Sequence, residues 1–197
     1  MEKRHKIFVA INLPGDIKKQ LFLYSQKFLD LPARWVPKDN LHITLEFLGA
    51  LTDMEIGEIC VAVKEVAERH GSFTIELQKV LYGPPLRQGS AGQAQTIPKM
   101  VWVEGKKSKE LAMIRQDLEN TLTEKISFIP ESRAFAPHIT LARINAMEFR
   151  QIEPEEVPEI NEVIDLAFTV ESIEVMESEM RKGGPVYTIL ESHNLNN

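Results

Sequence analysis

The sequence has only one cysteine, Cys60, and no long run of hydrophobic residues. A single cysteine excludes an internal disulfide and a cysteine-rich metal site, and it is typical of proteins in a reducing cytoplasm. The apolar stretch near the N-terminus is short and is broken by Asn12 and Pro14, which argues against a signal peptide. No later segment approaches the roughly 20 apolar residues of a membrane-spanning helix. We therefore expect a soluble, cytoplasmic protein with no membrane partner.

The sequence also lacks an excess of positive charge, because its 23 lysines and arginines are outnumbered by 29 aspartates and glutamates, for a net charge of −6. Binding along the length of a nucleic acid normally requires a basic surface, so the composition argues against it. The net charge is still compatible with a local basic site that recognises only the end of a nucleic-acid strand. Hydrophobic residues make up 43% of the 197, which is enough for the core of one ordinary domain.

Strand-like and helix-like patterns mix along the chain. Residues 7–11 alternate as in a strand, whereas residues 56–66 repeat at helical spacing after a capping-box signature formed by Thr52 and Glu55. Several connections between expected strands are short enough for antiparallel pairing, which predicts an α+β fold. Segment 82–99 is rich in Gly, Pro and Gln, so we expect a long flexible loop there.

Two segments nearly repeat each other: “NLHITLEFLG” begins at Asn40 and “FAPHITLARI” begins at Phe135. Both contain His-Ile-Thr-Leu, and their histidines, His42 and His138, lie about half a chain apart. The repeat predicts two similar lobes, related by a pseudo-twofold axis. We expect these lobes to interleave in one monomeric domain over residues 1–197, with the active-site cleft between them.

Alternation in a strand assigns the residues of each repeat to faces, because residues i and i+2 point to the same side. In the first copy His42 and Thr44, and by the same parity Glu46, lie opposite an aliphatic face. In the second copy His138 and Thr140 share a face. If the two lobes face each other, two imidazoles and two hydroxyls converge on one small site.

Two opposed histidines suit the cleavage of a phosphodiester by general acid–base catalysis. One neutral imidazole accepts a proton from the attacking oxygen, and one protonated imidazole donates a proton to the departing oxygen. In-line displacement places these two oxygens on opposite sides of phosphorus, so catalysts on opposite walls meet the requirement. The threonine hydroxyls can donate hydrogen bonds to the non-bridging oxygens as their charge grows.

Two other interpretations compete with this one. A single His-x-Thr segment is more often the solvated face of a half-exposed strand, but two identical copies reverse that preference. Zinc needs three or four protein ligands, and His5, His70 and His193 stand in a charged start, a helix end and a tail, where we expect surface residues. We therefore expect neither a metal nor another cofactor.

The chain resembles the two-histidine phosphoesterases, and among them the LigT-like RNA 2′,3′-cyclic phosphodiesterases, historically called 2′-5′ RNA ligases. The matching segments, in order, are “FVAINLP”, “RWVPKDNLHITLEFLG”, “PKMVWV”, “FAPHITLAR” and “GGPVYTIL”. The resemblance implies a bilobal fold, with an antiparallel sheet and flanking helices in each lobe and both His-x-Thr motifs facing the cleft between them. It also implies a hydrolase that opens a 2′,3′-cyclic phosphate at an RNA end and leaves a 2′-phosphate. By resemblance, His42 is the proton donor, His138 is the proton acceptor, and Thr44 and Thr140 bind the phosphate.

Three further residues are weaker candidates for binding the substrate. Arg143 lies out of strand phase with His138, so it can reach substrate only if the strand ends or bulges near Ala142. Tyr187 and Trp35 could stack on a base, although aromatic residues in such apolar segments belong more often to the core. In the loop, the side chains that could touch a polynucleotide are those of Arg87, Gln88, Gln93 and Gln95.

The sequence leaves two alternative functions open. One is 2′-5′ phosphodiester chemistry, either ligation of tRNA halves or cleavage of 2′-5′-linked oligonucleotides. No nucleotidylation motif or phosphate-cradling glycine loop is present, which argues against ATP-driven ligation but not against reversal of the cyclic-phosphate reaction. The other alternative is a nucleotide-binding module without turnover. In each case the expected partners are RNA ends or nucleoside 2′,3′-cyclic phosphates.

Overall fold

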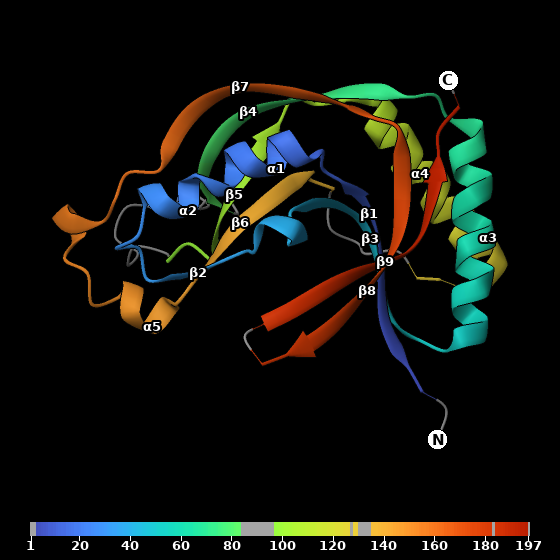
Figure 1. The fold of residues 1–197 in the computed structure, drawn as a ribbon, viewed down its shortest axis with the longest axis horizontal. Helices are drawn as coiled ribbons and strands as arrows, with labels where there is room; N and C mark the ends of the chain where they lie inside the picture. Colours follow the sequence, from blue (N-terminus) through green and yellow to red (C-terminus); the bar gives the residue numbers. More distant parts are fainter. Residues whose placement is uncertain (1–2, 84–96, 127, 130–134, 183, 197) are drawn as a thin grey trace.

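The two His-Ile-Thr-Leu segments lie next to each other in the middle of a single nine-stranded sheet (Figure 1). This arrangement comes from a computed structural model, which describes residues 3–83, 97–126, 128–129, 135–182 and 184–196. The strands are β1 (His5–Asn12), β2 (Ala33–Trp35), β3 (His42–Leu51), β4 (Phe73–Gly83), β5 (Met100–Gly105), β6 (His138–Ile144), β7 (Asn161–Val170), β8 (Ser172–Arg181) and β9 (Gly184–Asn194). The helices are α1 (Gly15–Phe22), α2 (Tyr24–Lys27), α3 (Asp53–Arg69), α4 (Lys109–Ile126) and α5 (Ala146–Phe149), with single 3-10 turns η1 (Lys38–Asn40) and η2 (Pro154–Glu156).

The strand order is β7-β4-β5-β6-β3-β1-β8-β9, with β2 paired to β6. Every named pairing is antiparallel, and one half-sheet (β7-β4-β5-β6) mirrors the other (β9-β8-β1-β3) in layout. Within the described residues, β3 and β6 are joined by one residue pair, Ile43 with Ile139. The α+β prediction with antiparallel sheets is confirmed, and the two half-sheets are continuous through this pair.

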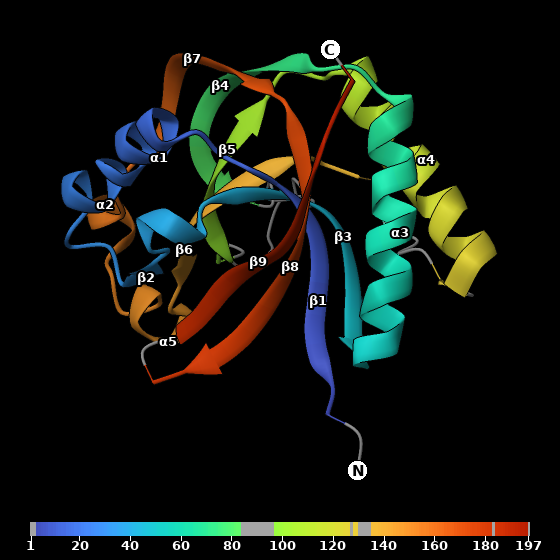
Figure 2. The ribbon, with the colours of Figure 1, turned by 45° about the vertical axis from the view of Figure 1, so that its right-hand side comes forward.

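The core lies on the face of the sheet that the helices cover. In α3, Thr52 forms the predicted capping box with Glu55, and Ile59, Val63 and Val66 are fully buried. Helix α3 packs against β8, β9 and α4, and α4 also contacts β3. Helices α1 and α2 lie beneath the arch of β7 and β4, whereas the β8–β9 hairpin projects toward the end of the molecule with β2 and α5 (Figures 1 and 2).

The first two residues of the predicted loop 82–99 belong to strand β4 in the structure. Residues 97–99 are described and lead into β5, whereas 84–96, including the loop residues named above as polynucleotide contacts, lie outside the described residues. None of the described helices is long and apolar enough to cross a membrane.

Candidate active site

The two histidines and two threonines share one face of the sheet, called here the histidine face. The residues that follow each histidine and threonine are buried on the opposite face: Ile43, Leu45, Ile139 and Leu141, each at most 2% exposed. Because Ile43 pairs with Ile139 in antiparallel register, the flanking positions of the two strands are also opposed. His42 therefore lies on the side of Thr140, and Thr44 lies on the side of His138.

The same backbone contact orients both imidazoles. Nδ1 of His42 lies 2.7 Å from the carbonyl oxygen of Asn40, and Nδ1 of His138 lies 2.8 Å from that of Ala136. A carbonyl oxygen only accepts, so Nδ1 carries the proton in each neutral ring, and Nε2 has a lone pair that can accept a hydrogen bond or a proton. The hydroxyl of Thr44 lies 3.0 Å from Nε2 of His42 and donates to it in this tautomer.

Burial lowers the pKa of His42 below its ordinary value, and so do the positive charges of Lys18, His138 and Arg143. The hydrogen bond that His42 donates to the carbonyl oxygen of Asn40 acts in the opposite direction. Burial also lowers the pKa of His138, helped by the charge of Arg143. Both imidazoles are therefore readily neutral, and an anion bound between them would favour protonation of one.

A β-bulge at Leu45 overturns the predicted placement of Glu46 on the histidine face. Val9 of β1 pairs with Glu46 and Ala10 pairs with Thr44, so Leu45 has no partner on β1 and the alternation slips by one residue. Glu46 is therefore turned toward the core side and is 4% exposed, and Phe47 lies on the histidine face and is 65% exposed.

Glu46 has a structural partner on helix α4. Its carboxylate accepts a hydrogen bond of 3.0 Å from Arg115, and Arg115 also pairs with Glu119 at 2.7 Å. The guanidinium of Arg115 further lies over the ring of Phe135 at 4.6 Å. These contacts assign Glu46 to the packing between β3 and α4 rather than to the substrate side.

An equivalent bulge at Leu141 brings Arg143 onto the histidine face. On β5, Val101 pairs with Ala142 and Trp102 pairs with Thr140, so Leu141 is the extra residue. Ala142 is fully buried and Arg143 is exposed. The strand thus bulges next to Ala142, which is the condition under which Arg143 was predicted to reach the substrate. The charge of Arg143 lowers the pKa of both histidines.

Aromatic side chains pack against both imidazoles. Of these aromatic residues, only Tyr187 was identified from the sequence. The ring of His42 lies 5.1 Å from that of Phe8 and 5.2 Å, edge-on, from that of Tyr187. The ring of His138 lies 4.3 Å from that of Trp102. The cross-strand registers β1–β3 and β5–β6 create the contacts with Phe8 and Trp102, and these registers were not readable from local pattern.

Trp35 lies on the other side of the sheet from these residues. Its pairing partner, Ala142, is in the main core, and Trp35 packs against that core. The structure therefore does not bring Trp35 together with the other predicted site residues, whereas it does bring Tyr187 to them.

The remaining histidines are held by carboxylates. His5 lies 2.6 Å from Glu177, His70 lies 2.9 Å from Asp117, and His193 lies 3.1 Å from Glu191. Their side chains are 10 to 18% exposed, so the prediction that they are surface residues was wrong. Among the described residues, no three His, Cys, Asp or Glu side chains are grouped so as to hold a metal ion.

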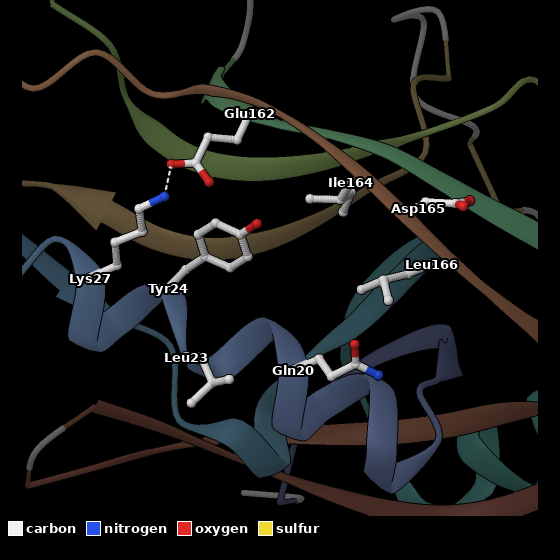
Figure 3. Close-up of a pocket in the computed structure, with 8 residues that line it drawn as sticks. All are labelled: Gln20, Leu23, Tyr24, Lys27, Glu162, Ile164, Asp165 and Leu166. Atoms are coloured by element: carbon white, nitrogen blue, oxygen red, sulfur yellow. Dashed lines mark hydrogen bonds and ion pairs between the residues drawn. The ribbon is translucent and has the colours of Figure 1, made fainter.

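A separate cavity of about 430 Å³ lies between α1–α2 and the edge strand β7 (Figure 3). Tyr24 and Lys27 face Glu162 across it, and Lys27 forms an ion pair with Glu162. None of the His-x-Thr residues lines this cavity, so it is distinct from the candidate active site.

A sheet with two equivalent His-x-Thr strands, whose imidazoles share one face, is the arrangement of a two-histidine phosphoesterase. The sequence matches the family of LigT-like phosphoesterases over residues 11–91 and 101–187. The chain belongs to this family of enzymes.

Similar proteins agree with this assignment. An RNA 2′,3′-cyclic phosphodiesterase of Aeropyrum pernix is 33% identical over 161 residues, which cover 81% of this chain and 85% of that protein. An enzyme of the same name from Thermus thermophilus is 28% identical and covers 96% of this chain and 90% of its own length. The fold is shared with the crystal structure of TT0787 from Thermus thermophilus (TM-score 0.79, 24% identity, 96% and 97% of the two chains). It is also shared with Escherichia coli LigT complexed with 3′-AMP (TM-score 0.76, 24% identity, 99% and 100%).

Proposed function

We propose that this enzyme hydrolyses the 2′,3′-cyclic phosphate at RNA 3′ ends to a 2′-phosphomonoester, with His42 as proton donor and His138 as proton acceptor. The observation that carries the proposal is that the two imidazoles lie on one face of neighbouring strands, and that Nδ1 of each donates to a backbone carbonyl. The names of the similar proteins support the choice of a cyclic phosphate at an RNA end.

In the proposed reaction, the neutral Nε2 of His138 accepts a proton from water as the water oxygen attacks phosphorus. Nε2 of protonated His42 donates its proton to the departing 3′ oxygen, on the opposite side of phosphorus. The phosphate stays on the 2′ oxygen, and both histidines return to their starting state by exchange with solvent. The negative charge of the substrate offsets the burial that lowers the pKa of His42, so His42 can carry a proton in the complex.

Thr44 and Thr140 supply hydroxyl donors for the non-bridging oxygens, whose charge grows in the transition state. The hydroxyl of Thr44 is already close to Nε2 of His42, and that of Thr140 lies 3.8 Å from the sulfur of Met100. Arg143 adds positive charge on the same face. Tyr187 closes one side of His42, where it can contact the nucleoside. The proposed reaction uses a monomeric chain and no metal or other cofactor.

The test is incubation with each nucleoside 2′,3′-cyclic monophosphate and with an oligoribonucleotide ending in a cyclic phosphate, in the presence and absence of EDTA. We expect a 2′-phosphate product in both conditions. A 3′-phosphate product would show that the 2′ oxygen departs and would contradict the proposed role of His42 toward the 3′ oxygen. Loss of all turnover in EDTA would favour a metal-dependent reaction. Joining of the cyclic end to a 5′-hydroxyl oligonucleotide would point to ligation, and tight binding without conversion would point to a binding module.

A further inference from the structure

The two arginines Arg34 and Arg143 are direct partners across the β2–β6 pairing. The pairs on either side of them, Ala33 with Ile144 and Trp35 with Ala142, all pack against the main core. Alternation then directs both arginine side chains to the opposite side, which is the histidine face. Both arginines are exposed.

Like charges at opposed positions of neighbouring strands destabilise a sheet, so this pair needs an explanation. Among the described residues, neither Arg34 nor Arg143 forms an ion pair or a side-chain hydrogen bond, whereas Arg4, Arg69, Arg115 and Arg181 each pair with a carboxylate. The chain carries 29 acidic residues, so carboxylates that could neutralise the pair are plentiful. Two guanidinium groups side by side, with no carboxylate partner in the part of the chain that the structure describes, are suited to binding a phosphate, to which each can donate two hydrogen bonds.

Arg34 is also connected to the reaction centre through the start of β9. A Cβ atom added to Gly184 would lie 3.6 Å from Nη1 of Arg34, so the guanidinium rests beside that glycine. The next residue, Pro185, accepts a hydrogen bond of 2.8 Å from the side chain of Asn40, whose carbonyl oxygen holds His42. Arg34 therefore lies one strand, about 4.8 Å, beyond Arg143 and close to the end of β9 that reaches the His42 side.

We infer that Arg34, together with Arg143, forms a binding subsite for a second phosphate: the phosphodiester on the 5′ side of the terminal nucleotide. The inference rests on the proposed function and narrows its substrate class. The reactive cyclic phosphate binds between the histidines, and the arginine pair binds the adjacent backbone phosphate. The enzyme thus prefers the end of an RNA strand to a free cyclic mononucleotide, although its overall charge is negative.

The experiment compares kcat/KM for three substrates: adenosine 2′,3′-cyclic phosphate, the dinucleotide ApA with a terminal cyclic phosphate, and that dinucleotide with a neutral methylphosphonate linkage. Loss of a hydrogen-bonded charge pair corresponds to about a 10- to 100-fold change. We expect the wild-type enzyme to prefer the charged dinucleotide over the other two substrates by that factor. Arg34→Gln should reduce this ratio toward one, and Arg34→Lys should keep part of it. Arg4→Gln removes the same charge near the N-terminal end and should keep the full ratio.

Equal kcat/KM for the mononucleotide and the dinucleotide in the wild-type enzyme would overturn the subsite and leave the proposed function intact. An equal effect of Arg34→Gln and Arg4→Gln on the ratio would also overturn it. If no substrate is hydrolysed, the proposed function fails, and calorimetric titration with adenosine 2′-phosphate and with ApA 2′-phosphate still decides the subsite. In that titration, the second phosphate should raise affinity in the wild type and not in Arg34→Gln, and equal gains in both would refute the inference.

Discussion

The backbone of Ile43 pairs with that of Ile139, and in the described part of the chain this pair alone joins β3 to β6. In a regular antiparallel pair, diagonal neighbours on one face are about 7–8 Å apart. His42 and His138 are such diagonal neighbours, because each precedes its isoleucine. The backbone positions of the two histidines therefore lie on one diagonal of the histidine face, and those of Thr44 and Thr140 lie on the other.

Replacement of either histidine should abolish most of the activity. We expect His42→Ala and His138→Ala each to lower kcat by about 10²- to 10⁴-fold, because each removes one proton-transfer group. The double variant should be little worse than either single one, since the two groups act together. Steady-state kinetics with a cyclic-phosphate substrate measures the effect, and circular dichroism checks that the fold is kept. Near-normal turnover in either variant would contradict the acid–base pair.

The pH dependence of kcat/KM should be bell-shaped, with its maximum on the acidic side of the ordinary imidazole pKa of about 6.5. The reason is that burial lowers the pKa of both histidines in the free enzyme. Arg143 carries positive charge that disfavours imidazolium, so Arg143→Gln should raise both pKa values and move the whole profile to higher pH. A profile of unchanged position in this variant would show that Arg143 does not act on the histidines.

Gly83 leaves room for the indole of Trp102. A Cβ atom at this position would lie 2.2 Å from Cδ2 of Trp102, whose ring packs on His138. We expect Gly83→Ala to lower the free energy of unfolding by about 1–3 kcal/mol through overpacking, and to lower kcat because the indole must shift. Thermal and urea unfolding, together with kinetics, measure both effects.

Gly57 provides the matched control, because nothing lies within 4 Å of a Cβ atom added there. This glycine is in the exposed part of α3, so Gly57→Ala should stabilise the protein by about 0.5–1 kcal/mol. Equal behaviour of the two variants would argue against a steric role for Gly83.

The substitution Glu46→Gln tests whether strand β3 is bulged at Leu45, which places Glu46 on the core side, or regular, which would place it on the histidine face. In the structure the substitution weakens a buried contact with Arg115, so the free energy of unfolding should fall by about 1–3 kcal/mol. The affinity for a cyclic-phosphate oligonucleotide should change little. Glu58→Gln, on the exposed side of α3, should stay within about 0.5 kcal/mol of the wild type. A gain in RNA affinity without a loss of stability would instead place Glu46 on the histidine face.

The sequence was sufficient for the parts of the fold that depend on local pattern. Alternation over the His-Ile-Thr-Leu segments placed His42 with Thr44 on one face, and the capping box located the start of α3. Parity failed after Leu45, because the bulge there is determined by the pairing of β3 with β1 and not by residues in β3 itself. The same limit applies to Trp102, which contacts His138 only through the β5–β6 register.

The two repeats differ at the position that each bulge turns toward the histidines. The first repeat presents the exposed ring of Phe47, and the second presents the guanidinium of Arg143. A pair of imidazoles alone does not determine the orientation of the substrate, since either ring could donate or accept the proton. The exposed aromatic ring comes from the strand of His42 and the exposed cation from the strand of His138, so the two strands differ in the chemistry that they present on this face. We expect this difference between the two strands to determine the orientation in which a nucleotide binds, and hence which oxygen departs from phosphorus.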